Sequence, residues 1–177
     1  MSYLSYTRDY NNNLLMLLLR DHKRYMPIVT FFETMTQHLS ELSWGEAELI
    51  ATEVSKINQS GFCSGLRNGM TQALNADASA LKNTKLATAL AFALKINRSP
   101  NNIAQNDIDE VLDAGWSEQT VEDIVGLVAI QSLYNIISNG LGFKQIPETA
   151  FIEMGNDTVN KGGYTASFKQ YINPLKQ

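Results

Sequence analysis

Residues 44–70 decide the fold of this chain: WGEAELIATEVSKINQSGFCSGLRNGM. Ser43 and Glu46 stand three residues apart, the spacing of a capping box in which each side chain bonds to the backbone N–H of the other residue. Apolar side chains then recur at steps of three and four residues, at Leu49, Ile50, Val54 and Ile57. This pattern predicts an amphipathic helix over residues 44–58.

A second helix is expected from near Phe62 to about Leu74, and it carries Cys63, the only cysteine of the chain. If Ser60 is the N-cap, Cys63 falls in the first helical turn, where unpaired N–H groups carry partial positive charge and favour a thiolate. Arg67, four residues on, lies on the same helical face and favours it too. Burial among apolar neighbours acts in the opposite direction.

Helix signals recur along the rest of the chain, whereas strand signals are nearly absent. Pro27 fits the first position of a helix that ends near residue 39. Ser117 caps the longest expected helix, 118–138, in which the apolar residues predict deep burial; they include Val125, Leu133 and Ile136. The other expected helical segments are 11–25, 84–96, a short one from 106 that ends at Gly115, and 164–172. We therefore expect a single all-α domain over residues 1–177, with seven or eight helices.

The composition excludes several classes of protein. A chain of 177 residues that is 44% apolar and 18% charged can bury the core of one globular domain. Its net charge of −4 argues against a general nucleic-acid binder. The longest unbroken apolar run, residues 14–19, is far shorter than the roughly 20 residues of a membrane span and lacks the flanks of a secretory signal. His22 and His38 have no metal-ligand spacing, so we expect neither a metal nor a cofactor. A single cysteine excludes an intrachain disulfide, and cytoplasm is the default location.

Residues 44–70 resemble a known family. The stretch is similar to the AhpD-like (alkylhydroperoxidase D) and carboxymuconolactone decarboxylase superfamily, in particular its peroxidase-related branch. That family carries a glutamate on one helix and, about a dozen residues later, Cys-x-x-Cys-x-x-x-His at the start of the next. In this alignment Glu48 falls on the glutamate, Ser60 on the first cysteine, Cys63 on the second and Arg67 on the histidine.

The downstream sequence follows the family as well. Residues 85–143 contain an alanine-rich apolar helix, a short acidic helix ending in Ala-Gly-Trp-Ser, and a long apolar helix closing on Gly-Leu-Gly. The resemblance covers about residues 40–147 and is weaker over 1–40 and 148–177. It implies an AhpD-like all-α fold and a homo-oligomer, a dimer, trimer or hexamer, packed through exposed helical faces. In active members the second cysteine attacks a hydroperoxide, the first resolves the sulfenic acid as a disulfide, and the glutamate and histidine carry protons.

This chain departs from the family at the reactive positions. Ser60 cannot form a disulfide, and Arg67 stays protonated and cannot act as a base. The catalytic candidates that remain are Cys63, Glu48 and Arg67. We expect a peroxidase-related protein with weak one-cysteine thiol peroxidase activity through Cys63, reduced by an external thiol. The alternative is a non-catalytic oligomer that binds a partner or small ligand at the former redox site, and a third is a decarboxylase-like, non-redox enzyme.

Each candidate residue also has a structural interpretation. Cys63 is either a small semi-buried residue, a reactive thiol, or a thiol that pairs with the Cys63 of a second subunit. Glu48 either forms a salt bridge with Arg67, is exposed to solvent, or acts as a general acid/base; a buried Glu48 requires Arg67 as its partner. Arg67 pairs with that carboxylate or binds an anion, and Ser60 is most simply an N-cap. The segment 25–35 is a subunit contact or plain core. Three aromatic residues are core or interface residues and not a cofactor site: Trp44, Trp116 and Tyr134.

Overall fold

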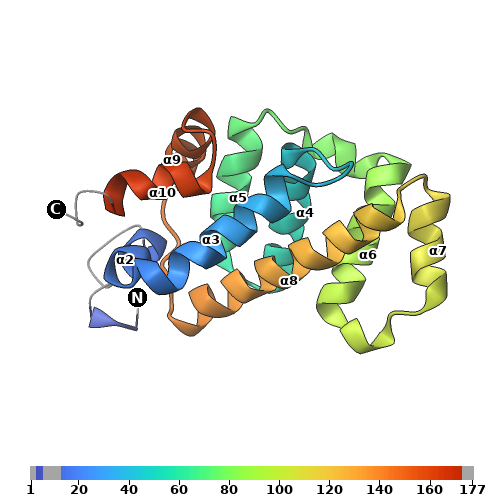
Figure 1. Ribbon diagram of the computed structural model, residues 1–177, viewed down its shortest axis with the longest axis horizontal. Coiled ribbons are helices and arrows are strands. Elements are labelled where there is room, and N and C mark those ends of the chain that lie inside the picture. Colours follow the sequence, from blue (N-terminus) through green and yellow to red (C-terminus); the bar gives the residue numbers. More distant parts are fainter. Residues whose placement is uncertain (1–2, 6–12, 173–177) are drawn as a thin grey trace.

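The computed structural model describes residues 3–5 and 13–172, which are helical almost throughout (Figure 1). This part of the chain forms nine α-helices and two short 3-10 helices and contains no strand. The elements are, in chain order, α2 (Asn13–Arg20), α3 (His22–Gln37), α4 (Trp44–Ile57), α5 (Gly61–Ala73), η1 (Ala78–Lys82), α6 (Thr84–Arg98), η2 (Pro100–Asn102), α7 (Gln105–Asp113), α8 (Glu118–Gly140), α9 (Glu148–Asn160) and α10 (Tyr164–Ile172). The all-α prediction is confirmed.

Helix α4 begins as the capping box predicts. The Ser43 hydroxyl accepts a hydrogen bond from the Glu46 backbone N–H at 3.3 Å, and the Glu46 carboxylate accepts one from the Ser43 N–H at 2.9 Å. Helix α5 begins at Gly61, one residue before the expected start. The two helices pack extensively against each other, so the local signals at residues 43–46 fix the entry of the pair that carries the candidate site.

The N-terminal helices differ from the prediction. Helix α3 begins at His22, because the Asp21 side chain caps it by accepting from the Arg24 N–H at 3.2 Å. The helix expected over 11–25 is therefore divided at Asp21, and its residues 11 and 12 lie outside the described residues. Pro27 is not the first residue of a helix but lies inside α3. The prediction was wrong because the Asp21 cap starts the helix five residues earlier, so that Pro27 falls in its second turn.

Helix α9 is the one described α-helix that the sequence patterns do not predict. It contains Gly155, which weakens a helix in water. In the structure this glycine lies against α5: a Cβ atom at Gly155 would stand 2.4 Å from the carbonyl oxygen of Gly69, and one at Gly69 would stand 2.2 Å from that of Phe151. The two glycines thus allow the backbones of α5 and α9 to touch, and these two helices form the most extensive helix contact in the described chain.

Helix α8 runs along the molecule from the α7 end to the α2 end (Figure 1). One face packs against α3, α4 and α6. The opposite face leaves Val125, Leu133 and Ile136 between 38% and 69% exposed, so the prediction that these residues are deeply buried is wrong. By length and composition alone, α8 is also the described helix that could cross a membrane. Its packing against three other helices accounts for the apolar residues on the inner face only.

Two groups of buried side chains form the core. The first lies between α4, α6, α7 and α8, with Ile50, Val54, Phe92 and Ile124 among its members. The second lies between α3, α5, α9 and α10, and its members include Phe32, Cys63, Met70, Phe151 and Phe168. The sequence-predicted cysteine is therefore a member of a packed core and not of a surface loop.

Candidate functional site

Glu48 is fully buried on α4 and is surrounded by hydrogen-bond donors. Its Oε1 atom accepts from the Tyr164 hydroxyl at 2.6 Å and from the indole N–H of Trp44 at 3.0 Å. Its Oε2 atom lies 3.4 Å from Nη1 of Arg67. The exposed position considered for Glu48 is wrong, and the expected salt bridge with Arg67 is confirmed.

Arg67, one helix further on, is only 1% exposed. Besides the bond to Glu48, its Nη1 atom donates to the Tyr164 hydroxyl. The guanidinium carbon lies 3.9 Å from the centre of the Phe32 ring, a cation–π contact that is worth most when water is excluded. Its Nε atom has no hydrogen-bond partner among the described residues. The charge is therefore held by one carboxylate, one hydroxyl and the face of an aromatic ring.

Burial and charge act in opposite directions on this cluster. Burial acts to lower the pKa of Arg67, but Tyr164 and Glu48 beside it raise that pKa above its ordinary value. Burial raises the pKa of the Tyr164 hydroxyl well above its ordinary value, and Arg67 only partly opposes the rise. At physiological pH Tyr164 is thus a neutral phenol that donates to Glu48, and Arg67 is a cation. Neither the guanidinium nor the phenol is therefore poised to release a proton near neutrality.

Cys63 lies in the first turn of α5, as the sequence predicts, and is 4% exposed. Its sulfur lies 3.2 Å from the hydroxyl oxygen of Ser138, near the end of α8. The Ser138 hydroxyl is in turn 2.6 Å from that of Ser60. Ser60 occupies the N-cap position of α5, as the sequence predicts, but its side chain makes no capping bond. Cys63, Ser138 and Ser60 thus form a continuous series of buried polar contacts between α5 and α8.

Cys63 and Arg67 stand one turn apart on α5 and influence each other electrostatically. The two share no hydrogen bond: the thiol contacts Ser138, whereas the guanidinium contacts Glu48 and Tyr164. The structure therefore brings the expected residues into one region as two linked groups, a thiol–hydroxyl group and a carboxylate–guanidinium–phenol group.

Sequence reasoning missed two of the participating residues, Ser138 and Tyr164, and took Trp44 only as a core aromatic residue. A signal for Ser138 does exist. Gln131, Asn135 and Ser138 are polar, buried and spaced by four and three residues on a helix that is otherwise mostly apolar. The first two donate to the buried Ser55 hydroxyl of α4, at 2.7 and 3.1 Å. Such a row of buried polar residues indicates hydrogen bonding between two packed helices, here α8 and α4. Tyr164 follows two glycines and carries no comparable pattern.

The other aromatic predictions concern packing. Trp116 is buried, and its indole N–H donates to the Lys85 carbonyl at 2.8 Å. Tyr134 is buried and meets Phe32 edge-to-face, with ring centres 5.3 Å apart. Both are core residues, as expected. In the described part of the chain, no three side chains among His, Cys, Asp and Glu are grouped as metal ligands would be.

Comparisons with known proteins agree with this architecture. No protein-family model matches the sequence, and no curated protein matches it. Among solved structures, the chain is similar to an uncharacterized peroxidase-related protein from Silicibacter sp. TM1040, with 18% identity and a TM-score of 0.70 over 79% of this chain and 78% of that one. The fold is AhpD-like. The structure of an alkylhydroperoxidase AhpD core, an uncharacterized peroxidase-related protein from Ralstonia eutropha JMP134, shows the same likeness, with 20% identity and a TM-score of 0.67 over 80% and 79% of the two chains.

The AhpD-like fold explains the pairing of α4 with α5 but not the side chains between them. At this level of identity the likeness establishes the backbone arrangement only. Any reaction at this site must therefore be argued from Cys63, Ser60, Ser138 and the buried ion pair themselves.

Proposed function

We propose that this AhpD-like protein is a weak one-cysteine thiol peroxidase in which Cys63 reduces a hydroperoxide. The observation that carries the proposal is the placement of the sulfur: it lies in the first turn of α5 and 3.2 Å from the Ser138 hydroxyl. Free N–H groups at a helix start attract negative charge, and the thiolate is the form of a cysteine that reacts. Arg67, one turn further, adds a permanent positive charge.

The first step transfers one oxygen atom. The Cys63 thiolate attacks the terminal oxygen of the hydroperoxide, so that an S–O bond forms while the O–O bond breaks. The leaving alkoxide takes up a proton and departs as the alcohol. The sulfur is oxidised by two electrons to a sulfenic acid, and the hydroperoxide is reduced by the same two electrons.

The second step requires a thiol from outside the chain, because Ser60 holds the position where the resemblance places the resolving cysteine. An external thiol attacks the sulfenic sulfur and forms a mixed disulfide with loss of water. A second external thiol then attacks the mixed disulfide, which restores Cys63 and releases the external disulfide. In total, one hydroperoxide and two thiols yield one alcohol, one disulfide and one water.

Glu48 has a positioning role in this proposal and is not a general acid/base. Its oxygens already accept from Trp44, Tyr164 and Arg67, which leaves little capacity to move a proton. The low exposure of Cys63 restricts contact with dissolved peroxide, so we expect slow turnover.

The test is hydroperoxide consumption with cumene hydroperoxide as substrate and excess dithiothreitol as reductant. Cys63→Ser removes the only thiol of the chain. The rate of hydroperoxide consumption should then fall to that of dithiothreitol alone. Ser64→Ala is the matched control, because this half-buried neighbour bonds only to the Gly61 carbonyl of its own helix. Equal consumption by wild type and Cys63→Ser would overturn the proposal.

A second candidate is a non-catalytic binding protein that retains the AhpD-like scaffold. The observation in its favour is the buried cluster around Arg67, whose Nη1 atom donates to Glu48 and Tyr164 and whose guanidinium lies over the buried Phe32 ring. Alkylation by iodoacetamide separates the two candidates. Under this second candidate Cys63 reacts about a hundredfold more slowly in the native chain than in the urea-unfolded chain. Under the first candidate the sulfur must be reachable from solvent, so the native thiol reacts more slowly than the unfolded one but well above that hundredfold lower rate.

A further inference from the structure

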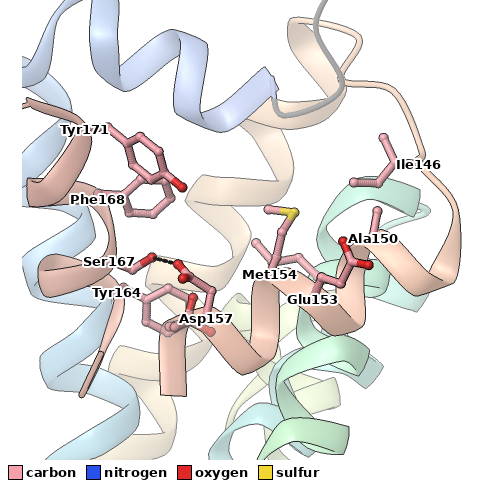
Figure 2. Close-up of a pocket in the computed structure, with 11 residues that line it drawn as sticks. Ile146, Ala150, Glu153, Met154, Asp157, Tyr164, Ser167, Phe168 and Tyr171 are labelled. Carbon is pink, nitrogen blue, oxygen red and sulfur yellow. Dashed lines mark hydrogen bonds between the residues drawn. The ribbon is translucent and has the colours of Figure 1, made fainter. Parts of the chain in front are cut away.

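A cavity of about 300 Å³ lies between α9 and α10 and borders the carboxylate–guanidinium–phenol group through Tyr164, whereas Cys63, Ser60 and Ser138 do not line it. Figure 2 shows its side chains converging from both helices and from the segment before α9. The lining residues are Leu66, Ile146, Ala150, Glu153, Met154, Asp157, Thr158, Tyr164, Ser167, Phe168 and Tyr171. This volume is at the lower end of small-molecule sites, which suits a ligand of few atoms.

Most of the wall is apolar. In Figure 2 the rings of Phe168 and Tyr171 lie close together on α10, and Met154 projects from α9 toward the space between the helices. Phe168 is buried, whereas Tyr171 is 45% exposed and marks the open side. An aromatic ring with one face accessible can hold either an apolar group or a cation.

The charged groups that the described residues place in the wall are all negative. They are Glu153 and Asp157, and no described lysine, arginine or histidine lines the cavity. Glu153 is exposed and has no hydrogen-bond or ionic partner among the described residues. Asp157 accepts from the Ser167 hydroxyl at 2.9 Å and from the ammonium group of Lys161. Burial acts against its charge, but these two bonds hold the pKa of Asp157 below its ordinary value, so it is ionised.

The contacts of Lys161 show that an ammonium group can bind beside this cavity. Its ammonium group pairs with Asp157 and also lies 5.9 Å from the centre of the Tyr171 ring. A primary ammonium belonging to the protein therefore already rests on one carboxylate and one aromatic face at this cavity. Glu153, one helical turn before Asp157, offers a second carboxylate to a second cation.

We propose that the cavity between α9 and α10 binds a small organic ammonium, with the charge at Glu153 and an apolar or aromatic group against Met154, Phe168 and Tyr171. A purely apolar ligand would make no use of the Glu153 carboxylate, which has no ionic partner among the described residues. An organic anion would be repelled by Glu153, whereas Asp157 is already paired with Lys161. Two carboxylates without a third ligand do not form a cage for a hard cation. This inference does not depend on the chemistry of Cys63.

The test is isothermal titration calorimetry with three probes of similar size: 2-phenylethylammonium, 2-phenylethanol and phenylacetate. We expect saturable binding of the ammonium, at least about tenfold weaker binding of the alcohol, and no binding of the anion, because a hydrogen bond to a charged group contributes about a factor of ten or more. Equal affinity for the ammonium and the alcohol would overturn the proposal. Absence of saturable binding of the ammonium would overturn it as well.

Substitutions locate the ligand. Glu153→Gln should weaken ammonium binding about tenfold, whereas Glu122→Gln, an exposed carboxylate on α8, should leave it unchanged. Lys161→Gln should strengthen binding, since it frees Asp157 and the Tyr171 ring from the internal ammonium. Ala150→Phe should abolish binding by filling the cavity, with a thermal unfolding curve to show that the variant is folded. If Glu153→Gln and Glu122→Gln behave alike, the assignment of the charge to this cavity fails.

Discussion

A carboxylate and a guanidinium that leave water together each lose several kcal/mol of hydration, and only their mutual contact and added hydrogen bonds offset the loss. Glu48 and Arg67 are in this position, since both are essentially unexposed and each is the other's ionic partner. We expect Glu48→Gln and Arg67→Met each to lower the free energy of unfolding by about 3 kcal/mol or more, because either change leaves a buried charge unpaired. Urea denaturation at pH 7 measures both.

The double variant Glu48→Gln/Arg67→Met is the decisive comparison. It removes both charges, so its cost should be well below the sum of the single costs. Tyr164→Phe serves as a reference: it removes one neutral donor to Glu48 and should cost about 1–3 kcal/mol. Strictly additive costs in the double variant would show that the two side chains are not coupled.

For individual residues, the sequence predicts positions within a helix and pairings that burial of a charge requires. The first-turn position of Cys63 follows from local helix signals, and the Glu48–Arg67 pair follows from the rule that a buried charge needs a partner. Tyr164 was beyond reach because it comes from an element more than 70 residues away in the chain and carries no pattern. Ser138 is also remote from Cys63, and only the row of buried polar residues on α8 could have indicated it. The Ser60 hydroxyl likewise contacts Ser138 of α8 and not the backbone of its own helix, and no local sequence pattern indicates this tertiary contact.

Among the elements, the contact of α5 with α9 determines where the candidate site sits. The glycines at this crossing have no room for a side chain, because a Cβ atom at Gly69 would lie 2.2 Å from the backbone of α9. Gly69→Ala should therefore push the helices apart and cost about 3 kcal/mol or more, at the upper end of overpacking effects, since the clash is with backbone and not with a flexible side chain. Thermal and urea unfolding measure the loss.

Gly140→Ala is the matched control for this prediction. Gly140 is also helical, but a Cβ atom there would meet nothing within 4 Å. Alanine at such a position should change the free energy of unfolding by less than about 1 kcal/mol, in the stabilising direction. If both alanine variants have the same stability as the wild type, the close approach of α5 and α9 is not tight in solution.

The same glycines explain why α9 was missed while α4, α6 and α8 were predicted nearly to the residue. From sequence alone Gly155 weakens a helix, and its benefit exists only once α5 lies against it. Pro27 shows the converse case, in which a strong local signal was overruled by the cap at Asp21. Local sequence patterns predict helix interiors and caps. They do not predict a residue, such as Gly155, whose benefit comes from contact with another helix.

For the whole molecule, the outer face of α8 is the feature that the packing of a single chain does not explain. Val125, Leu133 and Ile136 are 44%, 38% and 69% exposed and lie along one side of the helix, although the sequence pattern predicts their burial. Apolar residues grouped on a surface mark an interaction site. We propose that a second copy of the chain covers this face, in keeping with the oligomer that the family resemblance implies.

This proposal predicts a change of mass in solution. Ile136→Glu places a charge in the centre of the supposed interface, so it should convert the oligomer into monomers in size-exclusion chromatography with light scattering, with unchanged helical content by circular dichroism. Phe31→Glu is the control, because Phe31 is 51% exposed on α3, within the segment considered as the other subunit contact. Dissociation by Phe31→Glu but not by Ile136→Glu would move the interface to α3. A wild-type chain that is monomeric at about 100 μM would remove the reason to expect either interface, and the exposed face of α8 would then need another partner.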